Sequence, residues 1–299
     1  MQTAYRAHTY GEHSKNNQPQ ITVKPGEEFI ADTQIASGGD WLHSIDDLWS
    51  SEKNVGCNPT VCVAVEGAAP GGLLAVDILD ITPDALGYTA YSGGGGLPSA
   101  IWPGNDWGIN TRTVRIEGRF VHWDDKLKLP IRPMIGTLGT APAGEPIHNS
   151  CGGRHGGNMD IQEVRAGTTV YLPIEVPGAL LHIGDAHAIQ GDGEINGAGG
   201  IECGSTARLR VRLLEKPRNM RYVRMEDAEY IMTAACEKTT DESFYAASRE
   251  MIEWMTESYG FEARDAYLLM GQVLEARVTQ YVNPTRSYIV KMPKWALKG

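Results

Sequence analysis

The run ARLRVRLL at residues 207–214 alternates aliphatic residues with arginine. Successive side chains of a β-strand point to opposite faces, so the arginines of this run should share an outer face. We therefore interpret them as the exposed side of a strand. Similar short segments, separated by turns that use the chain's 35 Gly and 16 Pro, occur at residues 29–33, 61–66, 73–79, 113–123, 169–174 and 277–282. The pattern predicts a mainly β protein.

Helical spacing appears only late in the sequence. Thr239 and Glu242 fit a capping box, and apolar residues then recur at helical spacing until Gly260. A second helix is predicted over residues 262–271. The expected fold class is α+β, mainly β, with sandwich- or barrel-like antiparallel sheets and the C-terminal helices on one side. We expect a β-rich catalytic region at 1–215 and an α/β region at 216–299 that packs on it and is not an independent domain.

Composition and charge exclude several classes of partner. The 299 residues carry a formal net charge of -10, which opposes binding to nucleic acid and to acidic membranes. No run approaches 18 uninterrupted apolar residues, and the first 20 residues lack the apolar core of a secretory signal. The five cysteines are odd in number and form no CxxC pair, which favours reduced thiols. A cytoplasmic protein is the expectation.

Glycine is concentrated at residues 92–96, 152–157 and 191–200. The third stretch contains Asp192 and Glu194, whose carboxylates would repel a phosphate, and neither GxGxxG nor GxxxxGK[ST] is present. Nucleotide binding is therefore not expected. The first stretch is interpreted as a loop near a site or an interface, and its sequence does not distinguish the two.

Asp185 and His187 are two residues apart, so on an extended segment both side chains would point to one face and could bind one cation. Asp160, in a glycine-flanked loop, could add a further carboxylate. Mixed imidazole and carboxylate ligands suit Zn²⁺ better than Ca²⁺, although Ca²⁺ stays possible. The plainer alternative for Asp160, and equally for Asn158, is an Asx turn.

A series of short blocks carries a family resemblance. Together with VEGAAPG at 65–71 and VDILDI at 76–81, the blocks are PMIG at 133–136, HGGNMD at 155–160, YLP at 171–173, VPGAL at 176–180 and GDAHAIQGDGE at 184–194. In order and spacing they resemble the acetamidase/formamidase family over nearly the whole chain. The resemblance implies metal-assisted hydrolysis of a small linear amide to a carboxylate and ammonia, by a homodimer or homotetramer.

That chemistry suggests roles for the acidic residues. A zinc-bound water can supply hydroxide near neutral pH, and Glu194 or Asp192 would take its proton and deliver it to the departing nitrogen. Asn158 could orient the amide. A cyclic amide or a urea-like compound is an alternative substrate, and a non-catalytic metal- or sugar-binding β module is the rival from another class.

Three further residues are candidates for substrate binding: Asp32, His155 and Glu175. Asp32 lies in a segment that departs from the family's usual sequence, and Glu175 occupies a position where an apolar residue is more usual. If Glu175 faces the pocket, it would favour a cationic or amine-rich substrate; if it faces solvent, it has no such role. For His155 the alternative is an ordinary satisfied histidine.

Overall fold

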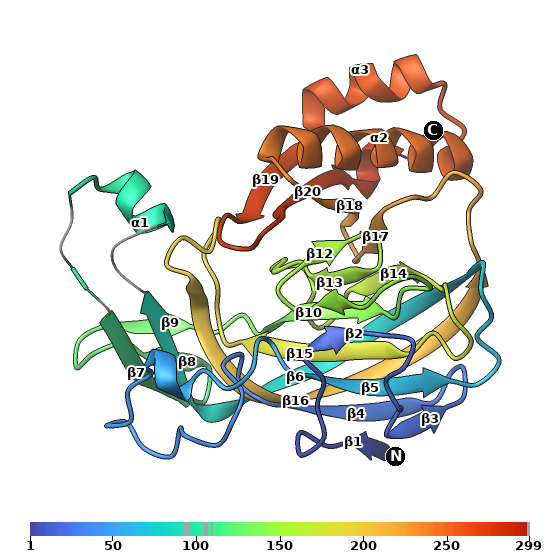
Figure 1. Cartoon of the computed structure of the whole chain (residues 1–299). Helices are drawn as coiled ribbons and strands as arrows, with labels where there is room; N and C mark the ends of the chain where they lie inside the picture. The colour runs from blue at the N-terminus through green and yellow to red at the C-terminus, as the bar shows by residue number, and fades with distance from the viewer. Residues whose placement is uncertain (92–95, 105–106, 109, 298–299) are drawn as a thin grey trace.

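The computed structural model describes residues 1–91, 96–104, 107–108 and 110–297 (Figure 1). Most of the first glycine-dense stretch, residues 92–95, lies outside the described residues. The strands of the first half are β1 (Gln2–Ala4), β2 (Glu12–His13), β3 (Ile21–Val23), β4 (Glu28–Thr33), β5 (Thr60–Val65), β6 (Gly72–Tyr91), β7 (Asn110–Glu117), β8 (Phe120–His122), β9 (Lys128–Pro130), β10 (Met134–Thr140) and β11 (Ile147–His148).

The second half continues with β12 (Gly152–Gly153), β13 (Gly156–Asn158), β14 (Thr169–Pro173), β15 (Leu181–His187), β16 (Ala198–Glu215), β17 (Val223–Glu226), β18 (Tyr230–Glu237), β19 (Glu275–Gln280) and β20 (Arg286–Pro293). The helices are α1 (Gly96–Ile101), α2 (Thr240–Tyr259) and α3 (Ala263–Val273), with 3-10 turns at Ser51–Lys53 and Lys294–Leu297.

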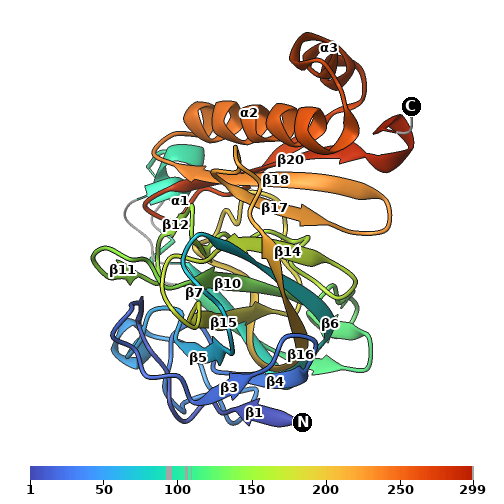
Figure 2. The same cartoon turned by 90° about the vertical axis from the view of Figure 1, so that its right-hand side faces the viewer.

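One curled, largely antiparallel sheet organises the molecule. Over the described part of the chain it joins 18 strands, while β2 and β11 form a separate pair. The two longest strands, β6 and β16, pair along most of their length, and three register shifts interrupt the ladder. Because a bulge bends and twists a strand, these irregularities help to curl the sheet into the half-barrel seen in Figures 1 and 2. The expected mainly β class with late helices is confirmed.

The arginine-rich run lies in β16 as predicted. Ala207, Leu209 and Val211 are fully buried in the main core, whose other members come from both halves of the chain. The intervening arginines lie on the outer face, where Arg212 forms an ion pair with Asp77 of β6 at 2.7 Å. The alternation therefore separates a core face from a charged face.

Two strand predictions needed correction. Residues 113–123 form the hairpin of β7 and β8, because Gly118, with φ +59, makes a turn between them. The strand expected at 277–282 ends at Gln280, whose side-chain oxygen accepts hydrogen bonds from the backbone N–H groups of Val282 and Asn283. Tyr281 and Val282 therefore lie in the turn that precedes β20, next to Asn283.

The two C-terminal helices lie on one side of the sheet, above β18 and β20 (Figures 1 and 2). The predicted capping box at Thr239 and Glu242 is present, and Gly260 closes α2 in a left-handed conformation. Apolar residues of α2 and α3 form a second core with β18 and β20. No helix in the described ranges has the length and apolar character needed to cross a bilayer.

Candidate active site

β15 carries Asp185 and His187 between two neighbouring strands, β10 and β16, and every residue of β15 is buried. His187 Nε2 lies 3.3 Å from Asp185 Oδ1, so the two side chains meet. They do so at an irregular point of the strand, because Asp185 has φ +59 and the ladder to β10 omits its pairing with Gly136. A left-handed conformation is costly for a residue other than glycine and is often found at functional sites.

Asp160 approaches the same point from the turn after β13. Its Oδ1 lies 3.9 Å from His187 Nε2, and its Oδ2 accepts a hydrogen bond of 2.6 Å from Asn283 Nδ2. Gly136 of β10 leaves the room for this approach, because a Cβ there would lie 2.4 Å from both Asp160 Oδ1 and Asp185 Oδ2. The glycine is therefore required by the two carboxylates beside it.

Two glutamates complete the acidic cluster. Glu202 of β16 is directly opposite His187 in the ladder, and its Oε2 lies 3.3 Å from His187 Nε2. Glu194, in the loop between β15 and β16, is buried with φ +46. Gly199 provides space for it, because a Cβ at that position would lie 1.6 Å from Glu194 Cγ. The left-handed backbone thus recurs at Asp160, Asp185 and Glu194.

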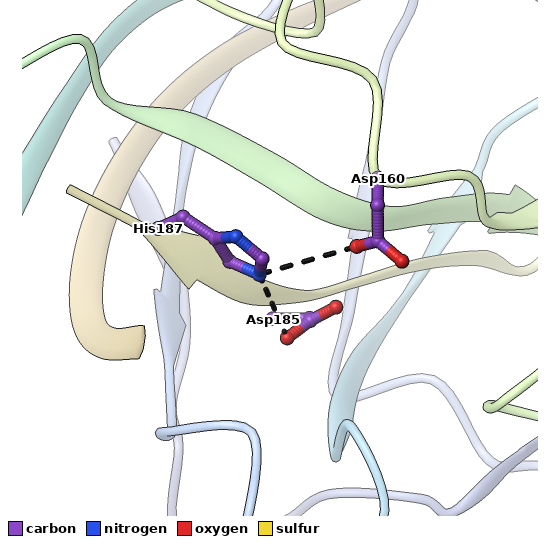
Figure 3. Close-up of side chains that lie close together, drawn as sticks. All are labelled: Asp160, Asp185 and His187. Atoms are coloured by element: carbon purple, nitrogen blue, oxygen red, sulfur yellow. Dashed lines mark hydrogen bonds and ion pairs between the residues drawn. The ribbon is translucent and has the colours of Figure 1, made fainter. Parts of the chain in front are cut away.

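The geometry around His187 suits a metal ion. Asp160, Asp185 and His187 offer ligand atoms that all lie within 4.8 Å of one another (Figure 3). Tetrahedral zinc with bonds of about 2.0–2.2 Å separates its ligand atoms by about 3.3–3.6 Å. The distances from His187 Nε2 to Asp185 and Glu202, both 3.3 Å, match that spacing, and the Asp160 distance exceeds it by a few tenths of an ångström.

Electrostatics also favour a cation. Burial raises the pKa of the Asp160 carboxyl to about 7, with the Asp185 carboxylate adding to the rise. Burial is likewise the largest reason that the pKa values of Glu194 and Glu202 are well above their ordinary range. Burial lowers the pKa of His187, but the carboxylates of Glu202 and Asp185 outweigh it and raise that pKa to about 10. Without a cation, the buried acids must take up protons.

Several oxygens of the cluster have no other partner. Within the described part of the chain, Asp160 Oδ1, Glu194 Oε2 and Glu202 Oε2 accept no hydrogen bond, and His187 Nε2 is the cationic group near Asp160 Oδ1 and Glu202 Oε2. Buried polar atoms are normally satisfied, so unpaired oxygens that converge on one point indicate a missing electropositive partner. A divalent cation fits that description, because it would bind the oxygens and offset their charge.

A cavity of about 620 Å³ adjoins the cluster. Its lining includes three acidic residues of the cluster, Asp185, Glu194 and Glu202, together with Asn158. Thr137 donates a hydrogen bond of 2.6 Å to Asn158 Oδ1, so the Asn158 amide N–H is the group left to contact a substrate. The cluster is thus buried in the protein but accessible from a cavity that can hold a small molecule.

The structure separates the sequence-predicted site residues into two sets. Asn158, Asp160, Asp185, His187 and Glu194 come together as described above. The remaining four do not line the cavity.

Asp192 points outward, with 65% of its side chain exposed, and pairs with Arg277 at 2.8 Å. Asp32 pairs with Arg6 at 2.6 Å. Glu175 is exposed and accepts a hydrogen bond from the backbone N–H of Ala143, so the condition for a cationic substrate, that it face the pocket, is not met.

His155 is buried but meets His13 edge to face, with ring centroids 4.9 Å apart, and belongs to a separate histidine cluster that also includes His182. Glycine-rich context pointed to Asp192 and His155, and departures from the family pattern pointed to Asp32 and Glu175; neither signal reports the direction of a side chain.

Sequence reasoning missed Glu202, Thr137 and Asn283. Glu202 follows the last glycine-dense stretch by two residues, and this proximity was its only local signal. Its role depends on being opposite His187 in the β15–β16 ladder. Asn283 reaches Asp160 from 123 residues away in the sequence. Contacts of this kind come from strand register and from tertiary folding.

Comparison with known proteins finds a matching family model and similar proteins. A model of the acetamidase/formamidase family matches residues 145–294, about half of the chain. The acetamidase of Mycolicibacterium smegmatis is 30% identical over 259 residues, which cover 65% of this chain and 63% of that protein. The formamidase of Methylophilus methylotrophus is 28% identical over 250 residues, which cover 64% and 61%. The chain therefore matches less than two thirds of the length of these relatives.

A solved structure extends the similarity to nearly the whole chain. The crystal structure of an acetamidase from Bacillus halodurans superposes with a TM-score of 0.90 at 32% identity and covers 97% of both chains. At this coverage the likeness is not confined to one motif.

Proposed function

We infer, from the premise that this chain belongs to the acetamidase/formamidase family, that it hydrolyses a small linear amide to a carboxylate and ammonia. One structural observation supports this activity in addition to family membership. Four buried carboxylates and His187 converge beside a cavity, and three of the carboxylate residues hold a left-handed backbone to do so. Such an arrangement is expensive unless it serves binding or catalysis.

We propose that Asp160, Asp185 and His187 hold a divalent cation, with Glu202 as the fourth candidate ligand. The distances favour Zn²⁺, and the oxygen-rich set leaves Ca²⁺ as the alternative. A bound Zn²⁺ would lower the pKa of a water and polarise an amide carbonyl.

Other residues of the protein would transfer protons, orient the substrate and position a metal ligand. Glu194 is the proposed general base, because it is buried at the cavity wall and its Oε2 has no hydrogen-bond partner in the described structure. It would accept a proton from the attacking water and return it to the departing nitrogen. Asn158, held by Thr137, offers its amide N–H to orient the substrate. Asn283 fixes Asp160 through its 2.6 Å hydrogen bond.

A substrate panel tests the proposal. The purified protein should release ammonia from at least one of formamide, acetamide and propionamide, chelation should abolish the release, and Zn²⁺ should restore it. Urea and a γ-lactam in the same panel test the alternative substrates. If the fully demetallated protein keeps its rate, the metal has no role in turnover.

Two substitutions separate a ligand from a base. His187→Ala should lower metal content and activity together, because it removes a direct bond to the ion. Glu194→Gln should retain the metal while turnover falls by about 10²- to 10⁴-fold. Loss of metal in Glu194→Gln would make Glu194 a ligand. Unchanged function in that variant would instead favour a non-catalytic binding module.

We also propose a homodimer or homotetramer in the cytoplasm. Exposed apolar side chains on the helical side of the molecule support an assembly, and they include Tyr245, Tyr267, Leu268 and Trp295 at 58–69% exposure. The five cysteines form no disulfide in the described structure, which suits a reducing compartment. Light scattering should give a mass of at least two chains, and a monomer at micromolar concentration would contradict the assembly.

A further inference from the structure

The cavity is much larger than the smallest amides require. Acetamide has four non-hydrogen atoms, whereas pockets of about 300–1,000 Å³ typically enclose drug-sized ligands. The 620 Å³ volume falls in that range. Trp49, Tyr88 and Tyr91 line it in addition to the acidic cluster. The cavity therefore has room for a substrate with a second functional group beyond its amide.

Arg286 supplies a positive charge to this cavity. Of the described residues that line it, Arg286 alone is cationic, while Asp185, Glu194 and Glu202 are acidic. Arg286 begins β20 and is partly buried. Its Nη1 donates a hydrogen bond to the backbone oxygen of Asn283, and within the described residues the guanidinium has no carboxylate within 4.0 Å. The guanidinium has five N–H donors in a fixed geometry, and this hydrogen bond therefore occupies only part of them.

The acidic residue opposite Arg286 in the β18–β20 ladder does not form an ion pair with it. Glu237 of β18 is directly opposite Arg286, so the two side chains share a face of the sheet. However, Glu237 Oε1 accepts a hydrogen bond of 2.6 Å from the Tyr222 hydroxyl instead. Arg286 therefore keeps donor capacity that a ligand's anionic group could use.

Asn283 limits how far Arg286 lies from the acidic cluster. Its backbone oxygen accepts from Arg286, and its Nδ2 donates to Asp160 Oδ2 at 2.6 Å. Since these two atoms of one asparagine are at most about 6 Å apart, the guanidinium and the Asp160 carboxylate lie within about 11 Å of each other. A ligand that reaches from Arg286 to the acidic cluster therefore needs a spacer of no more than roughly five bonds, at about 1.2 Å of extension each.

We propose that the substrate is an amide that also carries a carboxylate, such as the monoamide of a short dicarboxylic acid, and that Arg286 binds that carboxylate. The proposal rests on the proposed amide hydrolysis and specifies its substrate class. The amide lies at the acidic cluster and the carboxylate at Arg286. This polarity is opposite to the cationic substrate that Glu175 would have favoured, because Arg286, rather than Glu175, lines the cavity.

A matched pair of substrates tests the proposal. Succinamate and butyramide share an amide and a similar length but differ in the terminal carboxylate. Metal-loaded wild-type protein should show a higher kcat/KM, by ammonia release, for succinamate. Arg286→Ala should reduce the succinamate-to-butyramide ratio about ten- to a hundredfold, the range of a hydrogen bond between charged groups. Arg286→Lys should retain part of the ratio, and Arg286→Glu should favour β-alaninamide, which is cationic.

Controls separate the possible failures. Arg208→Ala, on the outer face of β16, should leave the ratio unchanged, and circular dichroism should show that each variant is folded. A wild-type ratio of one or less overturns the proposal, even if a variant does not fold. If no amide releases ammonia, the proposed function fails. Calorimetry with succinamate then tests whether Arg286 binds the carboxylate. Weaker binding to Arg286→Ala than to the wild-type protein supports this role, and equal binding refutes it.

Discussion

Gly136→Ala should disable the site by displacing two carboxylates at once. The added Cβ would lie 2.4 Å from Asp160 Oδ1 and 2.4 Å from Asp185 Oδ2, whereas ordinary contacts begin near 3.4 Å. Each oxygen must therefore retreat by about 1 Å, or β10 must move. Neither carboxylate can turn freely, because Asn283 holds Asp160 and the Thr137 hydroxyl lies 3.3 Å from Asp185 Oδ2.

A displacement of that size is large for a metal site. Ligand distances in a functional site hold to about 0.2 Å, and a misplacement of 1 Å can cost about 10² in rate. We expect metal affinity to fall by at least about tenfold and ammonia release by about 10²-fold. Overpacking in this fully buried strand should also destabilise the fold by about 1–3 kcal/mol.

The assay combines metal titration, ammonia release and urea denaturation on the same preparations. Gly191→Ala is the matched control, because a Cβ at that position meets no atom within 4 Å and Gly191 lies in the same loop as Glu194. The control should keep its metal and its rate. If Gly136→Ala binds metal and turns over like the control, Asp160 and Asp185 do not act together and the proposed ligand set is refuted.

Two further predictions concern stability. Burial lowers the pKa values of both His155 and His182 to about 4. The unfolded chain binds more protons below about pH 6.5, so stability is fully present above that pH and falls by up to about 3 kcal/mol per histidine as the pH drops to 4. Urea midpoints between pH 8 and pH 4 should show the fall, and it should be smaller in His155→Leu. Arg224→Ala should cost about 3–5 kcal/mol, because it leaves Glu250 buried without its 2.6 Å ion pair. An Arg224→Met, Glu250→Leu double variant that is no more stable than Arg224→Ala would contradict this reason.

Local sequence was sufficient for the elements whose cause is local. The alternation at 207–214 predicted a strand because a period of two separates a core face from an outer face. Thr239, Glu242 and Gly260 predicted both ends of α2, because capping uses only neighbouring backbone groups. The proximity of Asp185 to His187 was also foreseeable, since they are two residues apart in one strand.

Only the tertiary structure decided which side chains meet across the sheet. Glu202 contacts His187 because the register of β15 and β16 puts them opposite each other, and a shift of one residue would turn Glu202 to the other face. Asn283 and Arg286 line the cavity from the turn between β19 and β20 and from the first residue of β20, beyond the strand that the sequence predicted. Asp192, only two residues from Glu194, instead pairs with Arg277 at the surface. The sequence by itself determined the elements and the acidic segment, while strand register and backbone conformation determined which acids form the site.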